Sequence, residues 1–138
     1  MDERHTTNQR VLLVEDEIRL GESIQRGIAR HGHEVALVRD CASAISAGLH
    51  AVYDVLVLDI NLPDAAGWQV LTALDAAHRR PRTIVLSAIA PNSARVREFA
   101  PVSVLEKPFP IEALLRLIEL PDSARPSNVP IVEGSPAR

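Results

Sequence analysis

The sequence has only one cysteine, Cys41, so no disulfide bond can form within the chain. Chains without disulfides are typical of reducing compartments, and we therefore expect this protein in the cytoplasm. Aromatic residues are also scarce, since Phe, Trp and Tyr together make up 3% of the chain. The core must accordingly be built from Val, Leu, Ile and Ala.

A large surplus of charge is missing as well, because the formal net charge is −3. Proteins that bind nucleic acid or anionic membranes usually carry a basic patch, so we expect no direct nucleic acid binding and no membrane contact. No segment approaches the ~20 apolar residues of a membrane-spanning helix. The first residues also lack the apolar core of a signal peptide.

With 138 residues, the chain has room for one domain with a full core. We place this domain at residues 10–120, after a polar and flexible N-terminal segment, 1–9. Several prolines, together with serine and asparagine, predict a disordered tail over residues 121–138.

Five short apolar runs predict β-strands that are buried on both faces, as in a parallel sheet. They cover residues 11–14, 35–38, 55–58, 83–87 and 102–105. Apolar periodicity and capping signals predict helices between and after these runs, at residues 18–31, 42–49, 68–77, 93–99 and 110–118. This alternation indicates the α/β class: a doubly wound five-stranded parallel sheet with helices on both faces.

Polar residues that can carry chemistry follow the predicted strands directly. They are Glu15 and Asp16 after the first strand, Asp59 at the end of the third, Ser87 at the end of the fourth and Lys107 after the fifth. Right-handed crossovers bring the carboxyl ends of parallel strands to one edge of the sheet, where ligands bind in open α/β folds. We therefore predict that these five residues lie together.

This combination of side chains favours phosphoryl chemistry at a metal site. Three carboxylates in one place repel each other, and a divalent cation relieves that repulsion. Mg²⁺ is the predicted cofactor, because it prefers oxygen ligands and keeps several waters. The ammonium of Lys107 and the hydroxyl of Ser87 would then neutralise and bind a phosphoryl group on Asp59, since a carboxylate can accept such a group as an acyl phosphate.

Four segments, in this order and spacing, resemble the receiver domain of bacterial two-component response regulators: VLLVEDE, VLVLDINLPDAAG, IVLSA and EKPF. The resemblance covers about Arg10 to Leu120. It implies a flavodoxin-like sheet with strand order 2-1-3-4-5. It also implies phosphorelay signalling, with output through contacts to an unknown downstream protein and no catalysis beyond self-phosphorylation from a phosphodonor and autodephosphorylation.

The resemblance assigns a role to each acidic residue of the site. Asp59 would be the phosphoacceptor, with a sensor histidine kinase or a histidine phosphotransfer protein as the donor. Asp16 would bind Mg²⁺ directly, Glu15 largely through water, and the backbone carbonyl of Asn61 would complete the protein ligands.

The resemblance also extends to the fourth and fifth strands. Ser87 matches the hydroxyl position of the family and Lys107 its phosphate-binding lysine, with a cis peptide bond before Pro108. Two positions depart from the family pattern. Val104 stands where receivers usually carry Tyr or Phe, and Ala100 begins a turn that usually contains glycine. The fourth helix and fifth strand form the usual output face, so the departures concern how a signal is passed on.

Each of these residues also has a plainer interpretation. Taken alone, Asp59 is typical of a turn or cap aspartate, and Glu15 and Asp16 are typical of acids in the first turn of a helix. Cys41 and Trp68 are interpreted as core or rim residues. The histidines lack the spacing of metal ligands and are interpreted as surface residues: His5, His31, His33, His50 and His78.

The sequence is compatible with several functions. The chain is either a stand-alone receiver or the N-terminal receiver fragment of a longer DNA-binding response regulator, and a homodimer through the last helix is an alternative to a purely core role for that helix. A Mg²⁺-dependent phosphatase of the haloacid-dehalogenase type also uses an Asp nucleophile, but it needs an acid two residues later, where this chain has Asn61. An interaction domain that is never phosphorylated is the third alternative.

Overall fold

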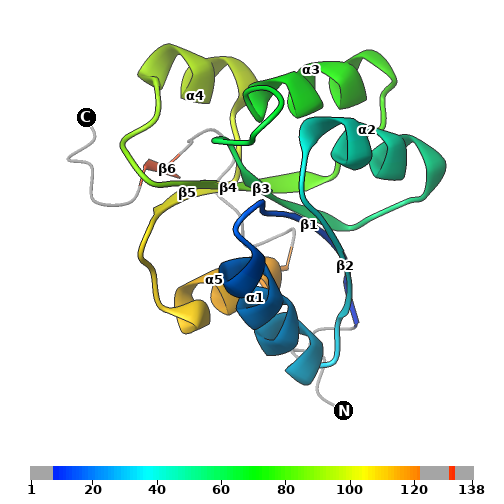
Figure 1. Ribbon diagram of the computed structural model, residues 1–138, viewed down its shortest axis with the longest axis vertical. Helices are drawn as coiled ribbons and strands as arrows, with labels where there is room; N and C mark the ends of the chain where they lie inside the picture. Colours follow the sequence, from blue (N-terminus) through cyan, green and yellow to red (C-terminus); the bar gives the residue numbers. More distant parts are fainter. Residues whose placement is uncertain (1–7, 122–130, 133–138) are drawn as a thin grey trace.

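The computed structural model describes residues 8–121 and 131–132 (Figure 1). The strands are β1 (Arg10–Val14), β2 (Glu34–Val38), β3 (Val55–Asp59), β4 (Arg82–Ser87), β5 (Ser103–Glu106) and β6 (Ile131–Val132). The helices are α1 (Ile18–Arg30), α2 (Cys41–His50), α3 (Trp68–Ala76), α4 (Ser93–Phe99) and α5 (Ile111–Ile118). The predicted elements are therefore all present, and their bounds differ from the predicted ones by only a few residues.

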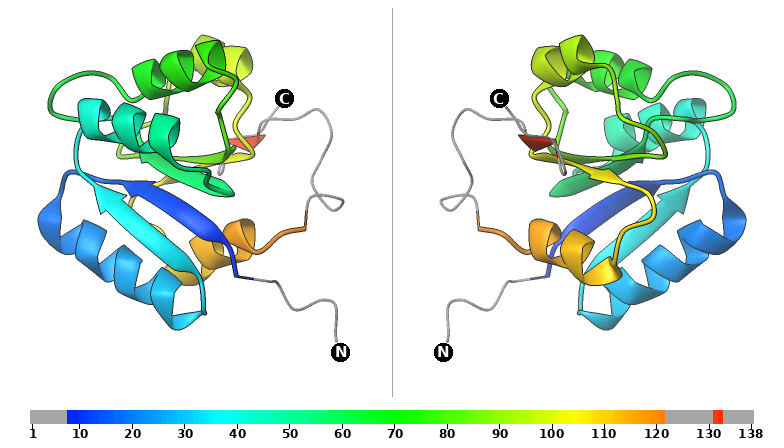
Figure 2. Two further views of the ribbon diagram at one scale, coloured as in Figure 1. Left: turned by 90° about the vertical axis from the view of Figure 1, so that its right-hand side faces the viewer. Right: turned by 90° about the vertical axis from the view of Figure 1, so that its left-hand side faces the viewer.

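The strands form one parallel sheet in the order β2-β1-β3-β4-β5-β6. The first five follow the predicted order 2-1-3-4-5. The sixth was not expected, because Ile131 and Val132 belong to the predicted disordered tail. Their backbone pairs with Ser103 and Val104 at the outer edge of β5, which otherwise carries unpaired backbone groups (Figure 2). The rest of residues 122–138, and residues 1–7, lie outside the described part of the chain.

Helices cover both faces of the sheet, as predicted. Figure 1 shows α2, α3 and α4 on one face and α1 and α5 on the other. Each face has its own apolar cluster, and the central strands β1 and β3 contribute alternate residues to both. The apolar residues of these two strands are completely buried. This explains why their sequences lack the polar alternation of a one-sided sheet.

The structure also tests several interpretations of single residues. Cys41 and Trp68 are buried in the core, as expected. The interpretation of His33 as a surface residue is wrong, because its side chain is buried. Its Nδ1 accepts a hydrogen bond from the amide of Gln9 (3.1 Å), and its Nε2 lies 2.9 Å from Oε2 of Glu119. These partners satisfy both ring nitrogens, which is what allows the polar ring to be buried.

Helix α4 belongs to the output face that the family resemblance implies, and a turn connects it to β5. Trp68 stacks on Phe99 with 5.6 Å between ring centroids, which links the start of α3 to the end of α4. Ala100 then ends α4 in the left-handed conformation, with φ 45° and ψ 59°. In the part of the chain that the structure describes, no helix has the length and apolar character needed to span a membrane.

Candidate functional site

The candidate site lies where β1, β3, β4 and β5 end at one edge of the sheet. The register pairs Asp59 with Leu86 and Ser87 with Glu106, so the last residues of β3, β4 and β5 lie side by side. The amide of Lys107 then donates to the carbonyl of Ser87 (2.7 Å) and continues this pairing beyond β5. Parallel strands joined by right-handed crossovers produce this alignment, although the aligned residues are far apart in sequence.

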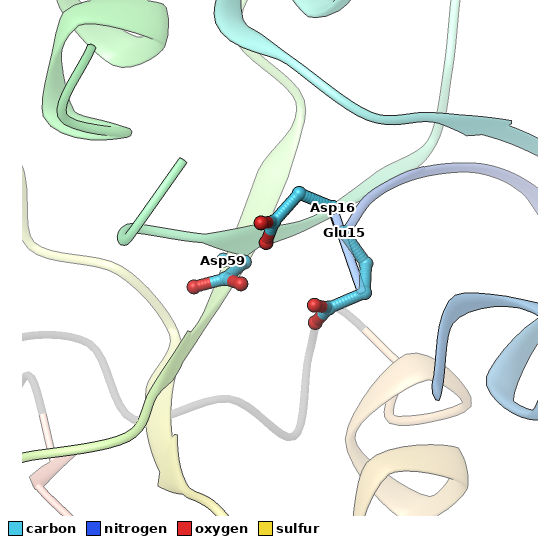
Figure 3. A group of neighbouring side chains, drawn as sticks. All are labelled: Glu15, Asp16 and Asp59. Carbon is cyan, nitrogen blue, oxygen red and sulfur yellow. The ribbon is translucent and has the colours of Figure 1, made fainter. Parts of the chain in front are cut away.

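Three carboxylates converge at this edge. Glu15, Asp16 and Asp59 each offer an oxygen atom, and these atoms lie within 4.8 Å of one another. Figure 3 shows the three carboxylates facing a common space. Glu15 and Asp59 are buried, with 0% and 2% of their surface exposed, whereas Asp16 is only half-buried and leaves the site open to solvent.

Lys107 lies between two of these acids. Its Nζ is 3.1 Å from Oδ2 of Asp59, and it is 3.0 Å from Oε1 and 3.2 Å from Oε2 of Glu15. The contacts with Oδ2 of Asp59 and Oε2 of Glu15 have hydrogen-bond geometry, whereas Oε1 of Glu15 is a buried acceptor without a hydrogen bond. The peptide bond between Lys107 and Pro108 is cis, as the family resemblance implied.

The charges of the site do not balance. Three carboxylates and one ammonium leave a formal charge of −2, because −3 + 1 = −2. Burial raises the pKa of Glu15 to about 7, and the charge of Asp59 adds to the effect, against the hydrogen bond from Lys107. Desolvation acts to lower the pKa of Lys107, but its bonds to Glu15 and Asp59 outweigh this and raise the pKa overall.

These residues fit a Mg²⁺ ion. The ligand atoms are carboxylate oxygens, the missing charge is that of a divalent cation, and Oε1 of Glu15 is buried without a hydrogen bond. Octahedral Mg²⁺ binds oxygens at about 2.1 Å and spaces them roughly 3–4 Å apart, so a small inward movement suffices. The amide of Asn61 donates to Oδ1 of Asp59 (2.8 Å), which places the Asn61 peptide beside the cluster.

A family model, described as the response regulator receiver domain, matches residues 11–119. The chain belongs to this family. It is 32% identical over 112 residues to the transcriptional regulatory protein PcoR of Escherichia coli, a match that covers 78% of this chain and 48% of PcoR. It is 36% identical over 115 residues to PrrA of Mycobacterium tuberculosis, covering 82% of this chain and 49% of PrrA. The chain thus spans about half the length of the curated relatives it matches.

Solved structures show that the fold of this receiver domain is shared. The receiver domain of the Francisella response regulator 1452 matches with a TM-score of 0.74 at 24% identity, covering 80% of this chain and 93% of the other. The chemotaxis response regulator CheY4 of Vibrio cholerae matches with a TM-score of 0.73 at 23% identity, covering 81% and 97%. These likenesses concern the arrangement of strands and helices.

The predicted site residues of the receiver domain differ in how their side chains lie relative to the acidic cluster. Glu15, Asp16, Asp59 and Lys107 come together as predicted. Ser87 is buried at the same edge, but its hydroxyl donates to the carbonyl oxygen of Ile89, two residues further along the chain.

Val104, one of the two departures from the family pattern, is buried in the apolar cluster that contains Trp68 and Phe99.

Two residues of the loop after Asp59 have structural roles that were not predicted from the sequence. A Cβ atom at Gly67 would lie 2.6 Å from Cα of Ile60 and 2.7 Å from the carbonyl oxygen of Asp59, so no other residue fits there without moving the β3 end. Asp64 binds the start of α2 with both carboxylate oxygens. Pro63 and Gly67, which lie in the segment VLVLDINLPDAAG, are typical of a loop, but they do not reveal those contacts.

Proposed function

We propose that this receiver domain accepts a phosphoryl group on Asp59 from the phosphohistidine of a sensor histidine kinase or a histidine phosphotransfer protein. The observation that supports this most is the position of Asp59 at the end of β3, where it shares Lys107 with Glu15. A lone turn aspartate needs neither a second buried acid nor a lysine, whereas a phosphoryl acceptor needs both a metal site and a counter-charge.

The chemical step requires little beyond positioning. An oxygen of Asp59 attacks phosphorus, an O–P bond forms and the P–N bond to the donor imidazole breaks, with its electron pair returning to the imidazole nitrogen. The Asn61 amide holds one Asp59 oxygen and Lys107 lies at the other, so the carboxylate is oriented before the donor arrives. The Ser87 hydroxyl leaves the Ile89 carbonyl and donates to a phosphoryl oxygen.

Glu15, Asp16, Asp59 and the carbonyl of Asn61 would hold the metal in this proposal. Bound Mg²⁺ would supply positive charge to the phosphoryl oxygens as their charge redistributes during transfer. Lys107 adds a second positive charge on the other side of Asp59. Glu15 keeps that lysine in place, since Nζ contacts both of its oxygens.

The proposal is tested by incubating the protein with a small-molecule phosphodonor and measuring the intact mass. We expect one added phosphoryl group in the presence of Mg²⁺, and none after chelation or in the Asp59→Asn variant. Asp54→Asn is the matched control, because Asp54 lies just before β3, at the end of the strand opposite to Asp59. This variant should take up a phosphoryl group like the wild type. Labelling that persists in Asp59→Asn would exclude Asp59 as the acceptor.

The alternative of a haloacid-dehalogenase-type phosphatase predicts a different result. Such an enzyme turns over a generic phosphomonoester, using an acid two residues after its nucleophile. This chain has Asn61 at that position, and an amide cannot transfer a proton in that way. We therefore expect no multiple turnover with a phosphomonoester, and steady release of phosphate would favour the enzyme.

The output of the protein is a separate proposal. PcoR and PrrA are named as transcriptional regulators, and this chain matches about half of each. We infer that the phosphorylated domain acts through protein contacts in the cytoplasm, either alone or joined to a DNA-binding domain in a longer product. A reading frame that continues past the codon for Arg138 would favour the longer product. Homodimer formation is a separate question, and the mass of the phosphorylated protein in solution tests it.

A further inference from the structure

The loop between Asp59 and α3 is attached to the start of a different helix. Oδ1 of Asp64 accepts a hydrogen bond from the amide of Cys41 (2.9 Å), and its Oδ2 accepts one from the amide of Ala42 (3.2 Å). Cys41 and Ala42 are the first two residues of α2. The thiol of Cys41 also lies 3.5 Å from the carbonyl oxygens of Ala65 and Ala66 and donates weakly to them.

Helix α2 does not need Asp64 as an ordinary cap. Asp40 immediately precedes the helix, and its Oδ1 accepts a hydrogen bond from the amide of Ser43 (2.7 Å). This is the usual N-cap interaction. Asp64 instead accepts hydrogen bonds from the two amides of the first turn that Asp40 does not bind. Its negative charge is also favoured at the positive end of the helix. The Cys41 amide is the main cause that lowers the pKa of Asp64, so this carboxylate is ionised at neutral pH.

Hydrogen bonds close the loop on itself, so a displacement of Asp64 also displaces the residues of the site at its base. Asn61 and Ala66 form an antiparallel bridge across it, and the amide of Gly67 donates to the carbonyl of Ile60 (2.9 Å). Asn61 is at the same time hydrogen-bonded to Oδ1 of Asp59. Asp64 therefore lies at the tip of a small closed loop whose base carries the phosphoacceptor and the Asn61 carbonyl.

We propose that Asp64 is a positioning residue for the phosphorylation site, because its carboxylate fixes the loop after Asp59 to the first turn of α2. This inference rests on the proposed function, since it names what holds the metal-binding carbonyl and the acceptor in place. Asp64 touches neither the metal nor the phosphoryl group. Its effect is on where Asn61 and Asp59 lie.

Two aspartates at the N-terminus of one helix allow a matched experiment. Asp64→Ala removes the contact between the loop and α2, whereas Asp40→Ala removes a cap of the same helix without touching the loop. Mg²⁺ affinity by titration calorimetry and the rate of phosphorylation by a small-molecule donor are measured for the full chain. We expect Asp64→Ala to weaken Mg²⁺ binding and slow phosphorylation, each by about tenfold, the low end for residues that support metal ligands.

The control variants separate positioning from folding. Asp40→Ala should lower the unfolding temperature but leave Mg²⁺ affinity and the phosphorylation rate within about twofold of the wild type. Asp64→Asn keeps one acceptor oxygen for one amide of α2 and should give intermediate values. Equal losses in Asp64→Ala and Asp40→Ala, or none in Asp64→Ala, would overturn the inference.

Amide hydrogen exchange tests the inference apart from phosphorylation. In Asp64→Ala, the amide of Gly67 should exchange faster because the loop is released, whereas in Asp40→Ala only the first turn of α2 should change. If the wild type takes up no phosphoryl group but Gly67 responds in this way, the proposed function fails and the fixing of the loop by Asp64 stands. If Gly67 exchanges equally in both variants, the inference fails.

Discussion

Nζ of Lys107 lies 3.1 Å from Oδ2 of Asp59, although 48 residues separate the two in sequence. The contact exists because β3 and β5 end at the same edge of the sheet, with β4 between them. Lys107 is also the only lysine of the chain, among fourteen arginines. Its ammonium is a compact charge, whereas the guanidinium of an arginine is larger and planar, so the two are not interchangeable here.

Replacing Lys107 should separate metal binding from phosphoryl transfer. The Lys107→Ala variant keeps all acidic ligands, so we expect it to bind Mg²⁺ at least as tightly as the wild type. Without the ammonium, the negative charge of the incoming phosphoryl group is not neutralised, and phosphorylation should slow by about a hundredfold. Intact-mass time courses and calorimetry measure the two effects. Phosphorylation at the wild-type rate would show that Lys107 does not contact the phosphoryl group.

Replacing Glu15 should have opposite effects on stability and metal binding. Glu15→Gln is nearly isosteric and removes one of the buried negative charges that repel each other. Without metal, we expect a higher unfolding temperature than in the wild type, whereas Mg²⁺ affinity should fall by about tenfold. Thermal unfolding with a chelator and with Mg²⁺ measures this. Glu17→Gln is the matched control, because Glu17 is exposed and should change neither value. A lower unfolding temperature for chelated Glu15→Gln would contradict the charge imbalance.

The buried thiol of Cys41 should make stability depend on alkaline pH. Burial, and then the charges of Asp64 and Asp40, raise the pKa of Cys41 from 9.0 to about 11. The native thiol therefore keeps its proton above the pH at which the unfolded chain loses it. This contribution to stability is complete below the unfolded pKa and is lost as pH rises through the folded pKa.

The measurement for Cys41 is urea unfolding of the wild type and Cys41→Ala across this range. The free energy of unfolding of the wild type, relative to Cys41→Ala, should fall between pH 9 and about pH 11 and stay constant at lower pH. Titration of all other groups is common to both proteins and cancels. A constant difference up to pH 11 would mean that the native thiol ionises like that of an unfolded chain.

The turn after α4 should be stabilised by glycine. Ala100 has φ 45°, and a left-handed conformation costs a residue with a side chain about 1–2 kcal/mol. Glycine avoids that cost but loses more entropy on folding, so we expect Ala100→Gly to gain about 0.5–1 kcal/mol. Ser23→Gly, in the exposed middle of α1, should instead lose about 0.5 kcal/mol. Urea unfolding measures both, and a destabilised Ala100→Gly would contradict the assigned backbone conformation.

Much of the fold and site could be predicted because it depends on local patterns. The unbroken apolar runs that end at Val14 and Leu58 indicate strands buried on both faces, and right-handed crossovers then align the strand ends. The acidic residues and Lys107 come together through that rule alone. No pairwise contact has to be guessed.

The contacts that were missed depend on partners distant in sequence. His33 is buried because Gln9 and Glu119 complete its hydrogen bonds, and Glu119 lies 86 residues away. Asp64 reaches the start of α2 only because α2 and α3 pack side by side on one face of the sheet. No periodicity or turn signal contains that information. The backbone pairing of Ile131 with β5 was missed for the same reason.

The most direct test of the central claim is to locate the phosphoryl group in the sequence. The protein is phosphorylated with a small-molecule donor and Mg²⁺, the acyl phosphate is reduced with borohydride, and the peptides are analysed by mass spectrometry. We predict that Asp59 alone is converted to homoserine. Conversion of Asp16 or another residue, with Asp59 intact, would contradict the account.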